Sequence, residues 1–115
     1  MKKINLEIID LFYGYRCNLS CKDCNPGSDI IRDTAYDPTL ESIFQTIDYF
    51  SRYVNVTRTL TLLGGEPMLY WQDTIVPIAK YIRKIMPTTR IAIPTNGKLL
   101  HKNIDGIIDF LLEID

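Results

Sequence analysis

The three cysteines of the chain, Cys17, Cys21 and Cys24, all lie within the eight-residue run CNLSCKDC. Thiolates separated by three and by two residues can converge on one metal centre, but three is an odd number for disulfides and one short of a closed tetrahedral zinc site. A [4Fe-4S] cluster held by three cysteines leaves one iron open to a ligand that is not protein, whereas electron-transfer clusters usually have four. The run therefore predicts an open metal centre that is suited to chemistry.

Two further runs, GGEP at residues 64–67 and PTNG at residues 94–97, combine turn-forming residues with polar groups. Gly64 and Gly65 let a ligand approach the backbone closely, and the carboxylate of Glu66 can pair with an ammonium group. Thr95 and Asn96 could hydrogen-bond a ligand. Each run alone is equally explained as a turn with a solvated side chain. Their meaning therefore depends on whether the fold brings them together.

The composition fits one small globular unit of 115 residues, of which 46% are hydrophobic and 23% are charged. The formal net charge of -1 provides no broad basic field, which argues against nucleic-acid binding. No apolar run approaches the roughly 18 residues that a membrane span needs. Glu7 and Asp10 lie where a signal peptide would be apolar. We therefore expect a cytoplasmic protein, because reducing compartments keep clustered thiols available for metals.

The apolar pattern alternates between strand-like and helix-like segments. Continuous apolar or β-branched stretches predict strands, and apolar residues that recur every three or four positions predict helices. Asp37 is predicted to cap the first helix, with Pro38 at its first position. The predicted strands cover residues 4–13, 59–63, 90–93 and 109–114, and the predicted helices cover residues 38–53, 75–86 and 99–107.

This alternation predicts an α/β fold of parallel strands joined by right-handed crossovers, as in doubly wound sheets and β/α barrels. In such folds the loops that leave the carboxyl ends of the strands build the active site. The runs CNLSCKDC, GGEP and PTNG follow the first, second and third predicted strands. Their shared place at one edge of the sheet favours a cofactor pocket over three unrelated turns.

CNLSCKDC after the first strand and GGEP after the second resemble the radical S-adenosylmethionine (radical SAM) superfamily, in which PTNG after the third strand is also common. The cysteine spacing is the superfamily's usual CxxxCxxC. The resemblance covers almost the whole chain and implies an incomplete, TIM-like barrel of parallel β/α units, here with about four strands. It also implies one core domain over residues 1–115 that is truncated relative to the family's six units.

The resemblance implies a [4Fe-4S] cluster on the three cysteines, with the amino and carboxylate groups of S-adenosylmethionine chelating the fourth iron. In the family, one electron from the cluster cleaves this cofactor to methionine and a 5′-deoxyadenosyl radical, which abstracts a hydrogen atom. The chain would thus be an oxidoreductase-type enzyme or the cofactor-binding part of one. The backbone of two glycines and one carboxylate would hold the methionine amino group, and two polar residues of the third loop are further candidates for cofactor contacts. These residues are Gly64, Gly65, Glu66, Thr95 and Asn96.

The chain departs from the family pattern at one position beside the cysteines. Asp23 replaces the aromatic residue that many family members carry before the third cysteine. The resemblance implies an electron donor of the flavodoxin or ferredoxin type, but the substrate cannot be inferred. An unpaired fourth strand would call for a partner chain or a missing carboxyl-terminal half. The alternatives are a binding module without catalysis of its own and a structural zinc site with His101 as the fourth ligand.

Overall fold

A computed structural model describes residues 2–19 and 37–115 of the chain. Within them, three parallel strands form one sheet in the order β1-β2-β3, namely β1 (Ile4–Phe12), β2 (Val54–Leu63) and β3 (Arg90–Ala92). Helices separate the strands along the chain, so the predicted α/β class with parallel strands is confirmed. The open sheet with its helices is consistent with part of a TIM-like barrel.

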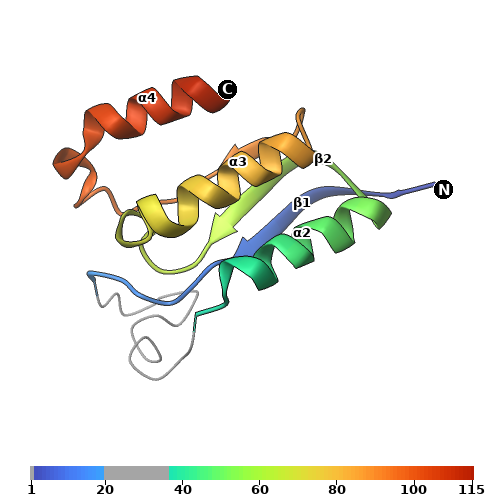
Figure 1. The fold of residues 1–115 in the computed structure, drawn as a ribbon, viewed down its shortest axis with the longest axis horizontal. Coiled ribbons are helices and arrows are strands. Elements are labelled where there is room, and N and C mark those ends of the chain that lie inside the picture. Colours follow the sequence, from blue (N-terminus) through green and yellow to red (C-terminus); the bar gives the residue numbers. More distant parts are fainter. Residues whose placement is uncertain (1, 20–36) are drawn as a thin grey trace.

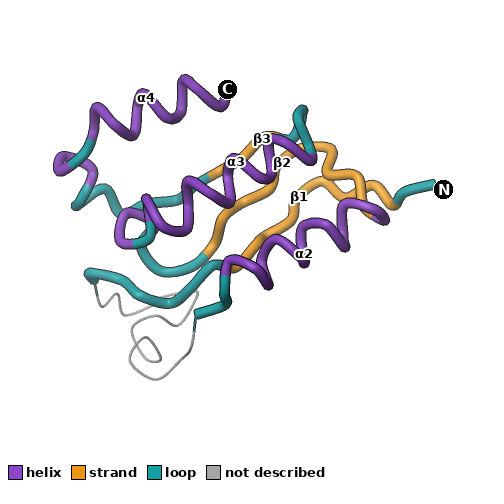
Figure 2. The backbone as a smooth tube through the Cα atoms, in the orientation of Figure 1, coloured by secondary structure: helices purple, strands orange, loops and turns teal. Residues whose placement is uncertain are grey.

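The strand register brings the loops after the strands to one edge of the sheet. β1 and β2 pair from Ile4 opposite Val54 to Phe12 opposite Leu63, so the two strands end level. β3 is shorter and pairs with residues 59–61 of β2. Figure 2 shows that the chain leaves all three strands toward the same end of the molecule. We call this end of the sheet the rim.

Helices α2 (Leu40–Tyr53) and α3 (Val76–Ile85) lie side by side over one face of the sheet (Figure 1). Their apolar residues recur at helical spacing, which turns one stripe of each helix toward the strands. Ile47, Ile78 and Ile82 are completely buried in the core that results. The two helices therefore cover one face of the sheet and form the core with it.

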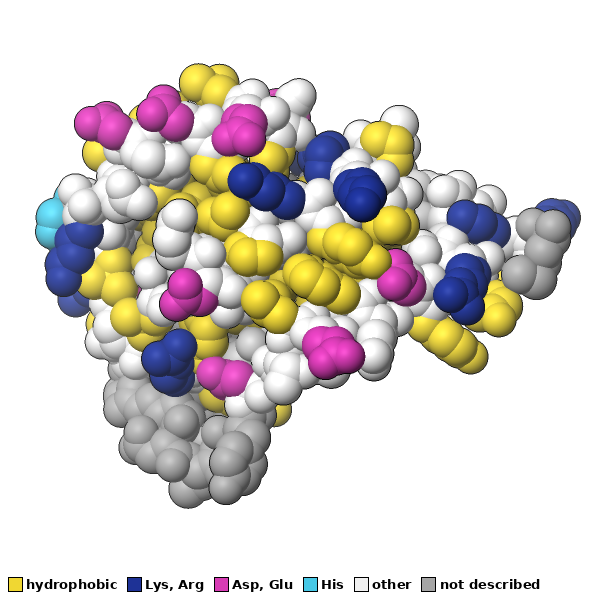
Figure 3. Space-filling model, in the orientation of Figure 1, with side chains coloured by type: hydrophobic (Ala, Val, Ile, Leu, Met, Phe, Trp, Pro, Cys, Tyr) yellow, Lys and Arg dark blue, Asp and Glu magenta, His cyan; other side chains and the backbone are white. Residues whose placement is uncertain are grey.

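Helices α2 and α3 contact each other through an aromatic pair and a hydrogen bond. The rings of Phe44 and Tyr81 stack with their centres 4.5 Å apart, and the Tyr81 hydroxyl donates a hydrogen bond to Asp48. This bond raises the pKa of Tyr81. Figure 3 shows hydrophobic side chains gathered over the middle of this face, with charged side chains scattered around them.

Short helical segments connect the larger elements. After β2, η1 (Pro67–Leu69) and η2 (Trp71–Ile75) lead into α3, and η3 (Leu100–Lys102) precedes α4 (Ile104–Ile114). In the described part of the chain, no helix is long and apolar enough to cross a membrane.

The start of α2 differs from the prediction. The N-cap is Thr39, not Asp37, because the Thr39 hydroxyl accepts a hydrogen bond from the Ser42 N–H at 3.1 Å. Pro38 therefore precedes the helix and does not occupy its first position. Asp and Thr are both good capping residues, but Asp37 instead accepts hydrogen bonds from the Tyr15 N–H and the Tyr70 hydroxyl.

The second strand starts earlier than predicted. β2 begins at Val54, directly after α2, and not at Thr59. Val54 and Val56 alternate with the polar residues Asn55 and Thr57, which is the period-two pattern of a half-buried strand. Continuous apolar residues occur only in the second half of β2, so the prediction from them did not include residues 54–58.

The predicted fourth strand at residues 109–114 is wrong, because these residues belong to helix α4. Ile107, Phe110 and Ile114 recur at helical spacing and pack against the core, whereas Leu112 is 74% exposed. A short apolar run such as FLLEI fits either period, so periodicity alone does not decide. The predicted helix at residues 99–107 contains η3 and only the first turn of α4.

The helical assignment of α4 predicts different costs for two truncations. Phe110 packs edge-on against Trp71 with ring centres 5.5 Å apart, so Phe110→Ala should lower the free energy of unfolding by about 3–5 kcal/mol. Leu112→Ala should change it by less than about 0.5 kcal/mol. In a strand the two side chains would share one face. Similar losses for both variants in urea unfolding would therefore contradict the helix.

Candidate metal and cofactor site

The loops after β1 and β2 are joined backbone to backbone beyond the ends of the strands. The Gly65 N–H donates to the Gly14 carbonyl at 2.9 Å, and the Glu66 N–H donates to the Arg16 carbonyl at 2.8 Å. These bonds continue the parallel pairing of the strands into the rim. The chain segment that leads to Cys17 is therefore held by the GGEP segment.

The two glycines are explained by this close approach. A Cβ atom on Gly65 would lie 1.9 Å from the Arg16 carbonyl oxygen, and one on Gly64 would lie 2.5 Å from the Gly14 carbonyl oxygen. Contacts this short exclude any larger residue. The motif predicts a ligand close to these glycines, but in the structure the neighbouring loop of the same chain occupies that side of them.

Glu66 is buried, with 1% of its surface exposed, and its carboxylate joins the ends of β2 and β3. One oxygen, Oε1, accepts from the Asn96 backbone N–H at 2.8 Å. The other, Oε2, accepts from the Thr95 hydroxyl at 2.6 Å and from the Met68 N–H at 3.1 Å. Three donors thus replace the water that a buried carboxylate loses.

Asn96 extends this connection to the first cysteine. Its side-chain nitrogen Nδ2 donates to Asn18 Oδ1 at 2.9 Å and lies within 4.0 Å of Cys17 Sγ, as a long N–H···S hydrogen bond. The structure therefore brings the PTNG segment against the start of the cysteine run. One predicted thiolate, Cys17, and three other predicted site residues, Glu66, Thr95 and Asn96, are therefore connected by hydrogen bonds.

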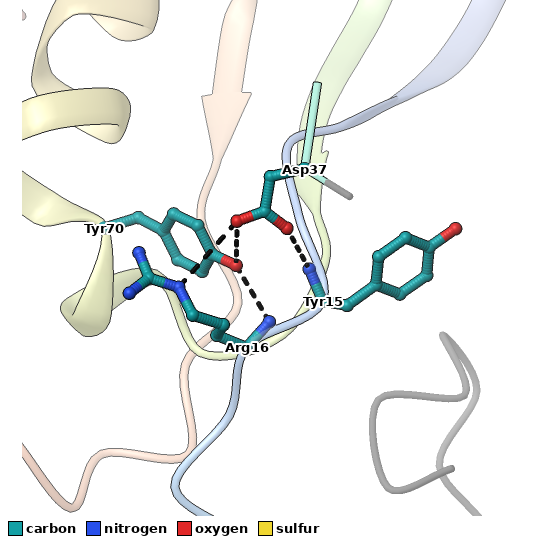
Figure 4. A network of polar contacts seen from close by, with 4 residues as sticks. All are labelled: Tyr15, Arg16, Asp37 and Tyr70. Carbon is teal, nitrogen blue, oxygen red and sulfur yellow. Dashed lines mark hydrogen bonds and ion pairs between the residues drawn. The ribbon is translucent and has the colours of Figure 1, made fainter. Parts of the chain in front are cut away.

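A second network holds the two ends of the cysteine segment together (Figure 4). The Tyr70 hydroxyl donates to Asp37 Oδ2 at 2.9 Å and accepts from the Arg16 backbone N–H at 2.8 Å. Asp37 Oδ1 accepts from the Tyr15 N–H at 3.1 Å. The Arg16 side chain lies over the Tyr70 ring, 4.5 Å from its centre, and its Nε is 3.8 Å from Asp37 Oδ2.

Sequence reasoning missed this second network. The sequence pattern favours Asp37 as a helix cap, and Tyr70 is one of seven tyrosines with no motif of its own. The two residues are 33 positions apart. No local pattern links them, so only the folded structure reveals that they meet.

The structure places the remaining predicted metal ligands as follows. Cys17 is half-buried in the loop after β1, whereas Cys21 and Cys24 lie outside the described residues. Across residues 2–19 and 37–115, no three side chains of His, Cys, Asp or Glu are grouped so that they could hold a metal ion. His101 is exposed in η3. The three-thiolate centre thus stays a prediction from the sequence.

The comparison with known families decides the classification. The family model described as "Radical SAM superfamily" matches residues 11–115. The chain belongs to the radical SAM superfamily. The resemblance seen in CNLSCKDC and GGEP is thereby confirmed, and the chain is a radical SAM enzyme or part of one.

A curated relative agrees with this assignment. The chain is 34% identical over 94 residues to molybdenum cofactor biosynthesis protein 1 of Dictyostelium discoideum. The match covers 80% of this chain but only 14% of the relative. The radical SAM chain described here therefore corresponds to a small part of that protein.

The bonds of Glu66 predict a stability effect at the rim. Glu66→Gln replaces one carboxylate oxygen by an amide NH₂, which cannot accept the hydrogen bond of a facing donor. We expect the free energy of unfolding in urea to fall by about 2 kcal/mol. The matched control is Glu7→Gln at an exposed position of β1, which should have little effect. If the free energy of unfolding falls no further than in the control, the hydrogen bonds of Glu66 do not stabilise the fold as described.

The burial of Tyr13 predicts an alkaline loss of stability. Burial, and then the charge of Glu66, raise the pKa of its hydroxyl, which donates to the Gly65 carbonyl at 3.1 Å. An unfolded tyrosine ionises near pH 10, so above about pH 10 only the unfolded chain releases this proton. Below that pH the contribution of Tyr13 to stability is fully present. Above it, the free energy of unfolding should fall by about 1.4 kcal/mol per pH unit for this residue.

Urea unfolding from about pH 9 to about pH 12 measures this slope. Tyr13→Phe should make the slope shallower, whereas Tyr49→Phe, at an exposed position on α2, should leave it unchanged. Equal slopes in the two variants would show that Tyr13 is not the group responsible.

Proposed function

We propose that this chain holds a [4Fe-4S] cluster through Cys17, Cys21 and Cys24 and binds S-adenosylmethionine at the open iron for reductive cleavage. The observation that carries the proposal is the joining of all three motif-bearing loops at one rim. The segment before Cys17 bonds to GGEP, and PTNG bonds to both Glu66 and Cys17. Membership of the radical SAM superfamily supplies the chemistry that such a rim serves.

The donor set fits an iron-sulfur cluster. Cysteine thiolates are the usual ligands of cluster iron, and hydrogen bonds to sulfur are a normal part of such sites. Cys17 is presented at the rim with an amide N–H directed at its sulfur. When bound, the cluster supplies the single electron that cleaves S-adenosylmethionine to methionine and a 5′-deoxyadenosyl radical.

The residues of the rim would position these groups. The backbone bonds of Gly65 and Glu66 fix the start of the cysteine segment, and the Tyr70–Asp37 bond fixes its end. Glu66 would fix the position of the PTNG segment through its bonds to Thr95 and Asn96. We propose that the segment Gly64–Glu66 lies beside the cationic methionine amino group. Glu66 would act there through its charge and not by direct contact, because its carboxylate is buried and already accepts three hydrogen bonds.

The wider assignments are proposals that follow from the same chemistry. The reaction needs an electron, and a flavodoxin- or ferredoxin-type protein is the donor we propose. A reducing cytoplasm would keep the three thiols available for iron. The match covers 14% of the curated relative, so we propose neither a substrate nor a partner chain from that likeness.

The test is anaerobic reconstitution of the full chain with iron and sulfide, followed by electron paramagnetic resonance of the reduced protein with and without S-adenosylmethionine. We expect one cluster signal, lost when any of the three cysteines is replaced by serine, and altered by the cofactor. Formation of 5′-deoxyadenosine should accompany this change. His101→Ala is the control and should leave the signal unaltered.

Other outcomes would separate the alternatives. Zinc in place of iron, lost in His101→Ala, would contradict the proposal and support a structural zinc site. If a cluster forms but its spectrum does not change when S-adenosylmethionine is added, the proposed cleavage is wrong. The chain would then be a binding module without catalysis of its own.

A further inference from the structure

Asn96 has three of its polar atoms fixed by neighbours at the rim. Its backbone nitrogen donates to Glu66 Oε1 at 2.8 Å, and its side-chain oxygen Oδ1 accepts from the Lys98 N–H at 3.0 Å. Its side-chain nitrogen Nδ2 faces Asn18 Oδ1 and Cys17 Sγ. For a residue in an exposed loop, this is an unusually complete set of partners.

These partners determine which way the amide group points. The Lys98 N–H can only donate, so the atom that faces it must be the oxygen. The nitrogen is then turned toward Asn18 Oδ1 and Cys17 Sγ, both of which accept. The opposite orientation would set oxygen against oxygen at Asn18 and an N–H against the N–H of Lys98. The two amide hydrogens are thus directed at Asn18 and at the cysteine sulfur.

The turn alone does not explain Asn96. The bond from the Lys98 N–H to Oδ1 is the usual way in which asparagine stabilises a turn, and Gly97 adopts the left-handed conformation with φ 80° that such a turn uses. Aspartate would serve this purpose equally well. Only the bonds donated by Nδ2 require asparagine, and both go to the start of the cysteine run.

We infer that Asn96 is a positioning residue whose side-chain N–H donates to Cys17 Sγ and raises the reduction potential of the cluster that this cysteine holds. The inference rests on the proposed function. A thiolate ligand carries negative charge, so the bond becomes charge-assisted and stronger than a bond to a neutral thiol. Reduction adds one electron to the cluster and increases the charge on its sulfurs. The N–H therefore stabilises the reduced form more than the oxidised form.

Glu66 acts on the cluster through Asn96. Its Oε1 holds the backbone of Asn96, and its Oε2 holds the hydroxyl of the preceding Thr95. The end of β3 is thereby fixed relative to the end of β2, which in turn is bonded to the segment that leads to Cys17. A buried carboxylate thus determines how closely an amide donor approaches a metal ligand.

The test is a redox titration of the reconstituted full chain, monitored by electron paramagnetic resonance. Asn96→Ala removes the donor without adding charge and should shift the midpoint potential to a more negative value. Asn96→Asp keeps the turn, loses the donor and adds a negative charge, so its shift should be in the same direction and larger. The matched control is Asn55→Ala, which removes an exposed bond to Asn5 at the opposite end of the strands and should leave the potential unchanged. An Asn96→Ala midpoint equal to that of the unmodified chain, with the cluster intact, would overturn the inference.

A second measurement examines the contact without any cluster. In the spectrum of the isotope-labelled apoprotein, the side-chain amide resonances of Asn96 should move in Cys17→Ala, while those of Asn55 stay in place. Unmoved Asn96 resonances would show that the contact does not form. If the unmodified chain assembles no cluster, the proposed function fails, and this measurement still decides whether Asn96 contacts the sulfur.

Discussion

The hydrogen bonds of one buried carboxylate, Glu66, hold the rim of this protein together. Moving a carboxylate out of water costs several kcal/mol unless donors replace the lost hydration, and the replacements here come from Met68, Thr95 and Asn96. Two of these donors belong to the loop after β3. The end of the third strand is therefore bonded to the end of the second, and through Asn96 both are connected to Cys17 in the loop after the first.

The Tyr70 network applies a second constraint, to the ends of the cysteine segment. The chain passes Arg16 before the cysteines and reaches Asp37 after them, and the Tyr70 hydroxyl bonds to both residues. Bringing the ends of a segment together costs conformational entropy that depends only weakly on its length. One side chain from the GGEP-bearing loop offsets that cost with two hydrogen bonds. The residues on either side of the cysteine segment are thus held together by contacts made elsewhere in the chain.

The sequence predicted the features that depend on local chemistry. Apolar and β-branched runs predicted all three strands. Because parallel strands end at the same edge of a sheet, the three motifs that follow these strands were predicted to lie close together. The fourth strand was wrong because a short apolar run near Phe110 satisfies the helical and the extended period alike. The use of Asp37 and the direction of the Glu66 carboxylate depend on side chains that meet only in the folded chain. Sequence reasoning thus identified Glu66, Thr95 and Asn96 as site residues, but it predicted neither the bonds between them nor the network of Asp37 and Tyr70.

The most direct test of the account is hydrogen exchange at the Asn96 backbone amide, followed by nuclear magnetic resonance of the isotope-labelled protein. Asn96 lies in an exposed loop, where an amide without a partner would exchange rapidly. The account predicts slow exchange in the unmodified chain, because the Glu66 carboxylate accepts this N–H at 2.8 Å, and fast exchange in Glu66→Ala. Exchange in the unmodified chain at the rate of an unstructured peptide would contradict the claim that Glu66 holds the rim together.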